Sequence, residues 1–105
     1  EIEFQISVEV DENKNKANKQ KHSIGFEKAK EIFEDKNAIE FQGTSRSELR
    51  ILRIGKTLSK ILIAVVYTMR SASIRIISAR SARKNETKSY LINSLSKPSQ
   101  DEDES

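Results

Sequence analysis

The chain has 105 residues, of which 33% are charged, and it contains neither cysteine nor tryptophan. That length predicts one domain, while the lack of cysteine excludes a disulfide framework, a thiolate metal site and a cysteine nucleophile, and the single histidine excludes a multi-histidine metal site. No apolar run approaches the roughly 20 residues of a membrane helix, and the first residues alternate instead of forming the apolar block of a signal peptide, so a cytoplasmic protein without a membrane span is predicted.

The net charge of +3 hides an uneven distribution along the chain. Residues 1–45 carry −3, residues 46–96 carry +9, and residues 97–105 carry −3. All seven arginines lie in the central basic segment. Guanidinium groups match phosphate with two parallel hydrogen bonds, and clustered positive charge attracts polyanions, so this segment indicates a nucleic-acid or other phosphate partner. A solvated basic surface without a partner is the alternative.

The first third of the chain predicts a strand followed by two helices. Apolar and polar residues alternate over Glu1–Val10, which predicts a strand with one buried face. Asp11 can cap the helix expected over Glu12–His22, since its carboxylate can accept from the first unpaired backbone amides. A second short helix is expected over Phe26–Phe33, where apolar residues recur at helical spacing.

Strands dominate the rest of the chain. Ile61–Thr68 is almost wholly apolar, as expected of a central strand covered on both faces. Gly43–Ser47 is expected to be a flexible polar loop, and the short connections favour an antiparallel meander. The other expected elements are strands at Ile39–Phe41, Leu49–Gly55 and Ile74–Arg80 and a final helix at Ser81–Leu95.

This order of elements predicts an α+β domain, with helices packed on an antiparallel sheet. The first strand can join that sheet only after a two-helix crossover, so it can lie parallel to its neighbour. We expect a single domain over residues 1–96 and an acidic, flexible tail over residues 97–105.

Four polar residues share one face of the first predicted helix. Lys14, Asn18, Lys21 and His22 fall at positions that bring their side chains to the same side. A hydrated helix surface is the alternative to a functional role for this group.

Arg75 lies in the middle of a mostly apolar strand. An unpaired cation is costly to bury, so Arg75 should face a carboxylate, a groove or a phosphate, unless it reaches solvent at a strand edge. Simple alternation places Arg75 with Ile77 and Ala79 on one face of the strand and Arg80 on the other.

Charged residues also gather where this strand meets the last helix. Arg80, Arg83 and Lys84 cluster there, and helix N-termini favour phosphate. Glu86 and Tyr90 are four residues apart and share a helix face. In the simplest interpretation, Glu86 pairs with a nearby arginine and Tyr90 is a core contact.

The chemistry that fits this set of side chains is metal-free phosphodiester cleavage. An RNA 2′-hydroxyl can attack its own phosphate if a base removes the proton, a cation stabilises the phosphorane and an acid protonates the leaving oxygen. An imidazole can take either proton role, while arginine and lysine supply positive charge. The sequence has no glycine-rich phosphate loop and no carboxylate metal cluster, so neither a metal nor a cofactor is expected.

Two blocks of residues resemble the BrnT family of bacterial toxins from type II toxin–antitoxin systems. The first block comprises Asp11–Lys14, Asn18, Lys21–His22, Phe26 and Ala29. The second comprises Ile54–Gly55, Val66–Arg70, Ile74–Arg80, Ala82, Glu86 and Tyr90. The specificity of the resemblance comes from the joint order and spacing of the two blocks.

The resemblance implies a RelE/ParE-like fold and a ribonuclease that inhibits translation and growth. It implies as partners RNA, a cognate BrnA-like antitoxin, and operator DNA reached through the antitoxin complex. By analogy with RelE-like nucleases, the expected catalytic residues are Arg75 and Arg80 for phosphate stabilisation, Tyr90 for positioning, and His22 or Glu86 for proton transfer. RNA contacts are expected from Lys14, Lys21, Arg50, Arg53, Arg70, Arg83 and Lys84.

Two other functions stay open on the sequence alone. A toxin of the same fold could inhibit a protein target, as ParE relatives do. A non-catalytic nucleic-acid-binding module would bind phosphates with salt-dependent affinity but would cleave nothing.

The chain departs from the family pattern at several positions. Ser71 stands in place of a turn glycine, and because serine tolerates a positive φ poorly, a distorted hairpin is expected there. Asn85 stands in place of an arginine, which thins the cationic cluster. The other departures are Val10, Glu12, Ser23 and Arg83.

Overall fold

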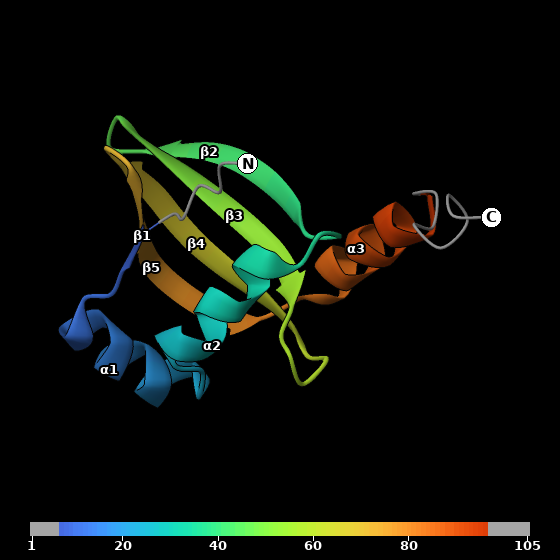
Figure 1. Cartoon of the computed structure of the whole chain (residues 1–105), viewed down its shortest axis with the longest axis horizontal. Helices are drawn as coiled ribbons and strands as arrows, with labels where there is room; N and C mark the ends of the chain where they lie inside the picture. Colours follow the sequence, from blue (N-terminus) through green and yellow to red (C-terminus); the bar gives the residue numbers. More distant parts are fainter. Residues whose placement is uncertain (1–6, 97–105) are drawn as a thin grey trace, which may run out of the picture.

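A computed structural model describes residues 7–96 of the chain as one five-stranded sheet with helices packed on it (Figure 1). The strands are β1 (Ser7–Glu9), β2 (Ile39–Ser45), β3 (Glu48–Lys56), β4 (Leu62–Arg70) and β5 (Ser73–Ser81). Their order is β1-β5-β4-β3-β2, with β1 parallel to β5 and every other pair antiparallel. The predicted α+β class and the parallel first strand are therefore confirmed, while residues 1–6 of that strand and the tail at 97–105 lie outside the described residues.

Helix α1 (Glu12–His22) is almost entirely polar, and of its two buried asparagines Asn18 bonds the sheet and Asn15 bonds the start of α2. Asp11 caps it by accepting from the backbone amides of Asn13 at 2.9 Å and Lys14 at 3.2 Å. The Asn18 amide donates to the Ala79 carbonyl at 2.7 Å and accepts from the Ala79 amide at 3.0 Å. In the described part of the chain, β1 pairs with residues 73–75 of β5, so the backbone groups of Ala79 farther along β5 have no partner on β1. Asn18 supplies their hydrogen bonds instead. Asn18 is thus buried, and not part of a hydrated helix face.

Helix α2 (Phe26–Glu31) and the following 3₁₀ turn η1 (Ile32–Glu34) cover one face of the sheet. Phe26, Ala29 and Ile32 are fully buried there against Ile63, Val65, Ile76 and Ala79. Gly55 makes the close approach possible, because a Cβ at that position would lie 2.7 Å from the Cβ of Ile32. The apolar spacing that predicted this helix therefore marks the main core.

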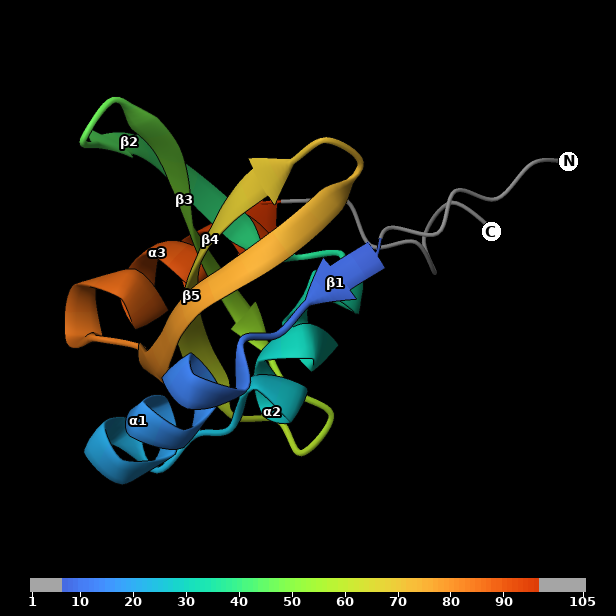
Figure 2. The ribbon, with the colours of Figure 1, turned by 90° about the vertical axis from the view of Figure 1, so that its left-hand side faces the viewer.

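Helix α3 (Lys84–Ser96) packs at one end of the opposite face (Figure 2). Tyr90 lies there against Ile54 and Ala64. The helix begins three residues later than predicted, because Ser81 still belongs to β5. Leu91, Ile92 and Leu95 remain exposed along α3.

The prediction of a flexible loop at Gly43–Ser47 was wrong. Gly43–Ser45 extends β2 and pairs with β3, so the turn consists of Arg46 and Ser47 alone. Both turn residues have positive φ (53° and 65°), as tight hairpin turns require. The segment is polar because it lies on an edge strand that faces solvent, and an exposed strand has no need of an apolar pattern.

The expected distortion at Ser71 was also wrong. Ser71 adopts the left-handed conformation with φ of 53°, and the hairpin still pairs through Arg70 and Ser73. The Ser73 hydroxyl lies 2.6 Å from the Glu9 carboxylate and 3.0 Å from the Arg70 carbonyl, so it can donate to β1 or within the turn.

A bulge in β5 changes the face of the sheet on which its arginines lie, so the predicted placement of Arg75 and Arg80 on opposite faces was wrong. Val66 pairs with Ser78 and Tyr67 pairs with Ile76, so Ile77 is an extra residue without a partner on β4. A bulge shifts the alternation by one, and Ile74, Ile76 and Ala79 are consequently all buried under the helices. Arg75 and Arg80 therefore lie on the same face, and not on opposite faces as simple alternation predicted.

Candidate functional site

The face of the sheet opposite α2 and η1, called here the open face, carries three rows of side chains across the strands. The register places Gly43 beside Arg50 on β3, and Thr68 beside Arg75 on β5. The next row consists of Phe41, Leu52, Val66 and Ser78, and the third of Ile39, Ile54, Ala64 and Arg80. Rows two residues apart along a strand are about 7 Å apart. An apolar row thus lies between Arg50 and Arg75 on one side and Arg80 on the other.

Helix α3 covers only one end of the open face. Tyr90 packs on the row of Ile54 and Ala64, while the apolar row beyond stays partly exposed. A depression of about 370 Å³ lies over this uncovered part. Its lining includes Phe41, Gly43, Arg50, Leu52, Val66 and Arg80.

Arg80 is held by Glu86, the third residue of α3. The two guanidinium Nη atoms each donate to one carboxylate oxygen at 2.8 Å. Glu86 also accepts from the Arg83 amide at 2.7 Å, as a capping residue does at a helix start. The hydrogen bonds from Arg80 lower the pKa of the Glu86 carboxyl, although its burial opposes the shift, and the same pair raises the pKa of Arg80. The predicted pairing of Glu86 with a nearby arginine is confirmed.

The other two arginines of the open face have weaker acidic partners. Arg75 Nη2 lies 3.8 Å from the Asp11 carboxylate, which confirms that this arginine faces a carboxylate. Arg50 Nε lies 3.5 Å from the carboxylate of Glu48 without making a hydrogen bond. Both guanidinium groups therefore keep donors for a further anionic partner.

Tyr90 anchors α3 instead of facing the depression. Its side chain is 2% exposed, and its hydroxyl donates to the Asp35 carboxylate at 2.7 Å. Burial and this carboxylate raise the pKa of Tyr90 to about 12. Burial also acts to raise the pKa of Asp35, but hydrogen bonds from Tyr90, Asn37 and Lys56 outweigh it and lower that pKa. Tyr90 therefore joins the helix to the segment before β2, which confirms its interpretation as a core contact.

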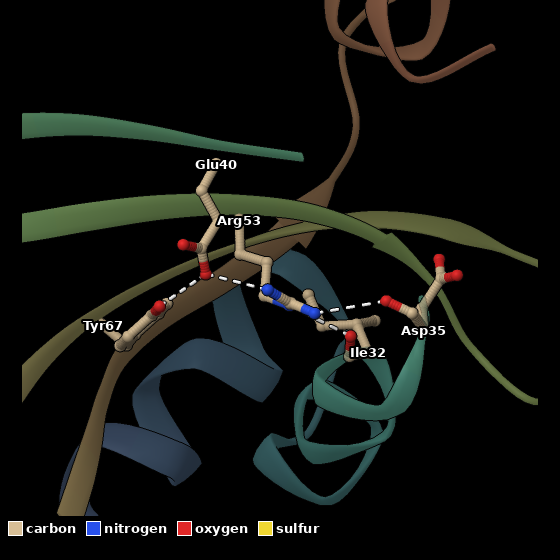
Figure 3. Close-up of polar contacts among 5 residues, drawn as sticks. All are labelled: Ile32, Asp35, Glu40, Arg53 and Tyr67. Carbon is tan, nitrogen blue, oxygen red and sulfur yellow. Dashed lines mark hydrogen bonds and ion pairs between the residues drawn. The ribbon is translucent and has the colours of Figure 1, made fainter. Parts of the chain in front are cut away.

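Arg53 points to the face opposite the open face, under η1 (Figure 3). It donates to the carbonyls of Ile32 at 3.1 Å and Asp35 at 3.2 Å, and to the Glu40 carboxylate at 2.8 Å. Glu40 also accepts from the Tyr67 hydroxyl at 2.5 Å. Arg53 thus connects β3 to η1 and β2, and this geometry gives it no place among contacts on the open face.

The remaining predicted residues lie around the edges of this site. His22 is half-buried at the end of α1, one turn after Asn18, while Lys14 and Lys21 are exposed on the same helix. Arg70 is exposed at the end of β4, and Arg83 and Lys84 are exposed at the start of α3. The fold therefore brings together Arg80, Glu86, Arg83 and Lys84, but it does not join them to the α1 lysines.

Phe41 and Gly43 belong to the depression but were not among the predicted site residues. Phe41 is 48% exposed and is an aromatic residue within the lining of the depression. The available signal was an aromatic residue two positions from a glycine, but Phe41 was predicted at the end of a short strand and Gly43 in a loop.

Within residues 7–96, no group of three or more acidic, histidine or cysteine side chains is arranged to hold a metal ion. None of the helices described there is long and apolar enough to span a membrane.

The comparison with known proteins decides the family. The model of the BrnT family, the ribonuclease toxin of type II toxin–antitoxin systems, matches residues 11–86. The chain belongs to the BrnT family. The crystal structure of the Brucella abortus ribonuclease toxin BrnT matches with a TM-score of 0.60 and 26% sequence identity, and the match covers 76% of this chain and all of that one. The search of curated proteins gave no significant match.

Membership in the BrnT family supplies the general function. The chain is a ribonuclease toxin of a type II toxin–antitoxin system, and as such it pairs with a cognate antitoxin. The matched range ends at Glu86, so it contains the open-face arginines and the start of α3.

Proposed function

We propose that this BrnT toxin binds RNA on the open face and cleaves it without a metal ion. The observation that carries the proposal is the bulge in β5, which places Arg75 and Arg80 on the same uncovered face as Arg50. Three guanidinium groups there can pair with phosphates and stabilise the charge that develops during cleavage. The element order described above, with a C-terminal helix on an antiparallel sheet, supports assignment to the RelE/ParE-like folds, and the cytoplasm is the expected compartment.

The proposed reaction is internal transesterification of RNA. A base accepts the proton of a 2′-hydroxyl while the 2′-oxygen forms a bond to phosphorus. The bond from phosphorus to the 5′-oxygen of the next nucleotide breaks, and an acid protonates that oxygen. The products are a 2′,3′-cyclic phosphate and a 5′-hydroxyl, so no metal-bound water is needed.

The geometry favours different roles for the predicted catalytic residues. Arg80 is the best phosphate stabiliser, because Glu86 fixes its guanidinium at two points. Glu86 is a poor proton acceptor, since its pKa is lowered, and we assign it to positioning Arg80. His22 remains the candidate for proton transfer because of its imidazole chemistry, although none of the contacts described above joins it to Arg80. Tyr90 acts by holding α3.

RNA contacts outside the reacting phosphate come from the rest of the basic surface. Arg50 and Arg75 lie on the open face, with Arg70, Arg83 and Lys84 at its borders. Lys14 and Lys21 are exposed on α1, apart from this surface, and would contact only a longer RNA. Arg53 is left out of this set because its donors bind groups inside the protein.

The antitoxin should cover the open face with an acidic segment. Such a segment would neutralise the charge of residues 46–96 and exclude RNA at the same time. A BrnA-like antitoxin fits this description, and operator DNA would be bound through the complex.

Cleavage in the presence of EDTA tests the proposal. Purified toxin should cleave a single-stranded RNA equally with and without EDTA and leave 2′,3′-cyclic phosphate ends. Arg80→Ala should lower the cleavage rate by about 100-fold or more, whereas Lys30→Ala, which removes one exposed charge on α2, should have no effect. Arg80→Lys keeps the charge but not the two-point pairing, and it tests the role if the alanine variant fails to fold.

Two results would contradict the proposal. Loss of cleavage with EDTA and recovery with a divalent cation would show that a metal takes part. Growth arrest by a toxin that leaves RNA intact would instead favour a protein target.

A further inference from the structure

We propose that the apolar row of the open face stacks one unpaired nucleobase of the RNA, with Phe41 as the stacking surface. This inference rests on the proposed function, because it uses the same face to bind RNA. It adds a base-binding subsite to a surface that otherwise recognises phosphates.

The position of Phe41 in the sheet supports a stacking role. Phe41 stands on the edge strand β2, and Leu52 and Val66 continue its row across β3 and β4. The Phe41 side chain is 48% exposed, whereas Leu52 and Val66 are partly buried. Packing within the described residues therefore leaves much of the Phe41 ring uncovered. Every base has a π-face, so stacking on such a ring does not require a particular sequence.

Gly43 leaves open space beside this ring. It lies two residues after Phe41 on the same face of β2, opposite Arg50. A Cβ built at Gly43 would have no atom within 4 Å, so no described side chain fills this position. The depression of about 370 Å³ includes both residues. Space for a planar ring therefore lies next to an exposed aromatic side chain.

The charges around the apolar row fit a nucleotide better than a neutral ligand. Arg50 lines the depression on one side and Arg80 on the other. Phosphates on either side of a stacked base would therefore each meet a guanidinium group. Arginine can also stack on a base through its own planar group.

Two substitutions can test the subsite without altering the arginines. Phe41→Leu keeps an apolar side chain but removes the aromatic ring. Gly43→Val places a branched side chain in the open space, where the structure has no atom to clash with it. Leu49→Ala is the matched control, since Leu49 is 46% exposed and lies in the same hairpin but on the opposite face. Circular dichroism should show that all three variants fold.

The probe is a short single-stranded RNA that carries 2′-O-methyl groups and one 2-aminopurine. The methyl groups prevent cleavage, and stacking quenches 2-aminopurine fluorescence. Phe41→Leu and Gly43→Val should each weaken binding by about 10- to 100-fold and reduce the quenching. The slope of log affinity against log salt should stay unchanged, because neither substitution removes a phosphate contact. Leu49→Ala should bind like the wild type.

The outcomes separate this inference from the function on which it rests. Absence of RNA binding by the wild type would overturn the proposed function together with the subsite. Normal binding and quenching by both folded variants would overturn the subsite alone. Loss of affinity with a reduced salt slope would also overturn it, because the substitutions would then act through the arginines.

Discussion

At the scale of single residues, partners inside the fold decide which charged groups can act on RNA. Arg53 and Arg80 are both strand arginines with short contacts to a carboxylate, but they point to opposite faces. Arg53 also binds two backbone carbonyls and lies 5.4 Å from the Phe33 ring centre. Arg80 donates to one backbone carbonyl, that of Ser81 at 3.2 Å, but it borders the depression. The same side-chain chemistry is therefore structural in one case and available for substrate in the other.

The pair of Glu86 and Arg80 predicts a dependence of stability on acid. The pKa of Glu86 in the folded chain is below its ordinary value of 4.5, so the unfolded chain binds the proton more tightly. The stabilising contribution of this pair is thus complete above about pH 5 and is lost as pH falls through the folded pKa. In thermal melts from about pH 7 to pH 3, the melting temperature of the wild type should exceed that of Glu86→Gln at pH 7. This difference should shrink as the pH falls.

Glu27→Gln, on the exposed side of α2, is the control for this experiment and should follow the wild-type profile. A difference between the wild type and Glu86→Gln that stays constant down to pH 3 would argue against the pair as the source of the acid sensitivity.

At the scale of elements, α1 shows how a polar helix can be fixed without an apolar face. Asn15 and Asn18 are its buried residues, and each bonds backbone groups of other segments. Helical spacing grouped Asn18 with the lysines and His22, because spacing indicates which residues share a face and not whether that face is buried. An asparagine side chain can accept from a backbone amide and donate to a backbone carbonyl, so it can bond both unpaired groups of a residue at a strand edge.

Removal of the Asn18 side chain should destabilise the whole domain. Asn18→Ala loses three hydrogen bonds and leaves the Ala79 amide and carbonyl buried without partners. We expect a loss of about 2–4 kcal/mol in the free energy of unfolding, measured by urea denaturation. Lys21→Ala, on the exposed part of the same helix, should change this energy by less than about 0.5 kcal/mol. Equal stability of the two variants would show that the Asn18 contacts contribute nothing.

At the scale of the whole molecule, two helical layers leave one part of the sheet uncovered. Helix α2 and η1 cover the face that holds the main core, α1 lies along the edge of β5, and α3 covers one end of the other face (Figure 2). The uncovered remainder carries arginines from β3 and β5. Positive charge from Arg50, Arg75 and Arg80 is thereby brought together on one surface.

This concentration of charge predicts a salt-dependent affinity for RNA. Single-stranded RNA binding should weaken with salt by a log–log slope of about −0.7 for each phosphate neutralised. Arg50→Ala and Arg75→Ala should each make the slope shallower by about 0.7, and Lys30→Ala should leave it unchanged. Titration of a 2′-O-methyl RNA at several salt concentrations measures these slopes. Unchanged slopes in both arginine variants would place the RNA elsewhere.

Local patterns in the sequence predicted the type and order of the elements and the basic segment, because helical spacing, strand alternation and charge are local properties. They missed the second half of β2, which is polar because it lies at the sheet edge. The sequence also predicted that Glu86 pairs with a nearby arginine, because several basic residues gather where the last strand meets the last helix; the structure shows that this partner is Arg80. Which face each arginine takes was decided by the tertiary structure. The bulge at Ile77 depends on pairing with β4, and one extra residue there moves Arg80 to the same face as Arg75. The roles of Arg53, Asn18 and Tyr90 likewise depend on partners from distant segments, which no local pattern records.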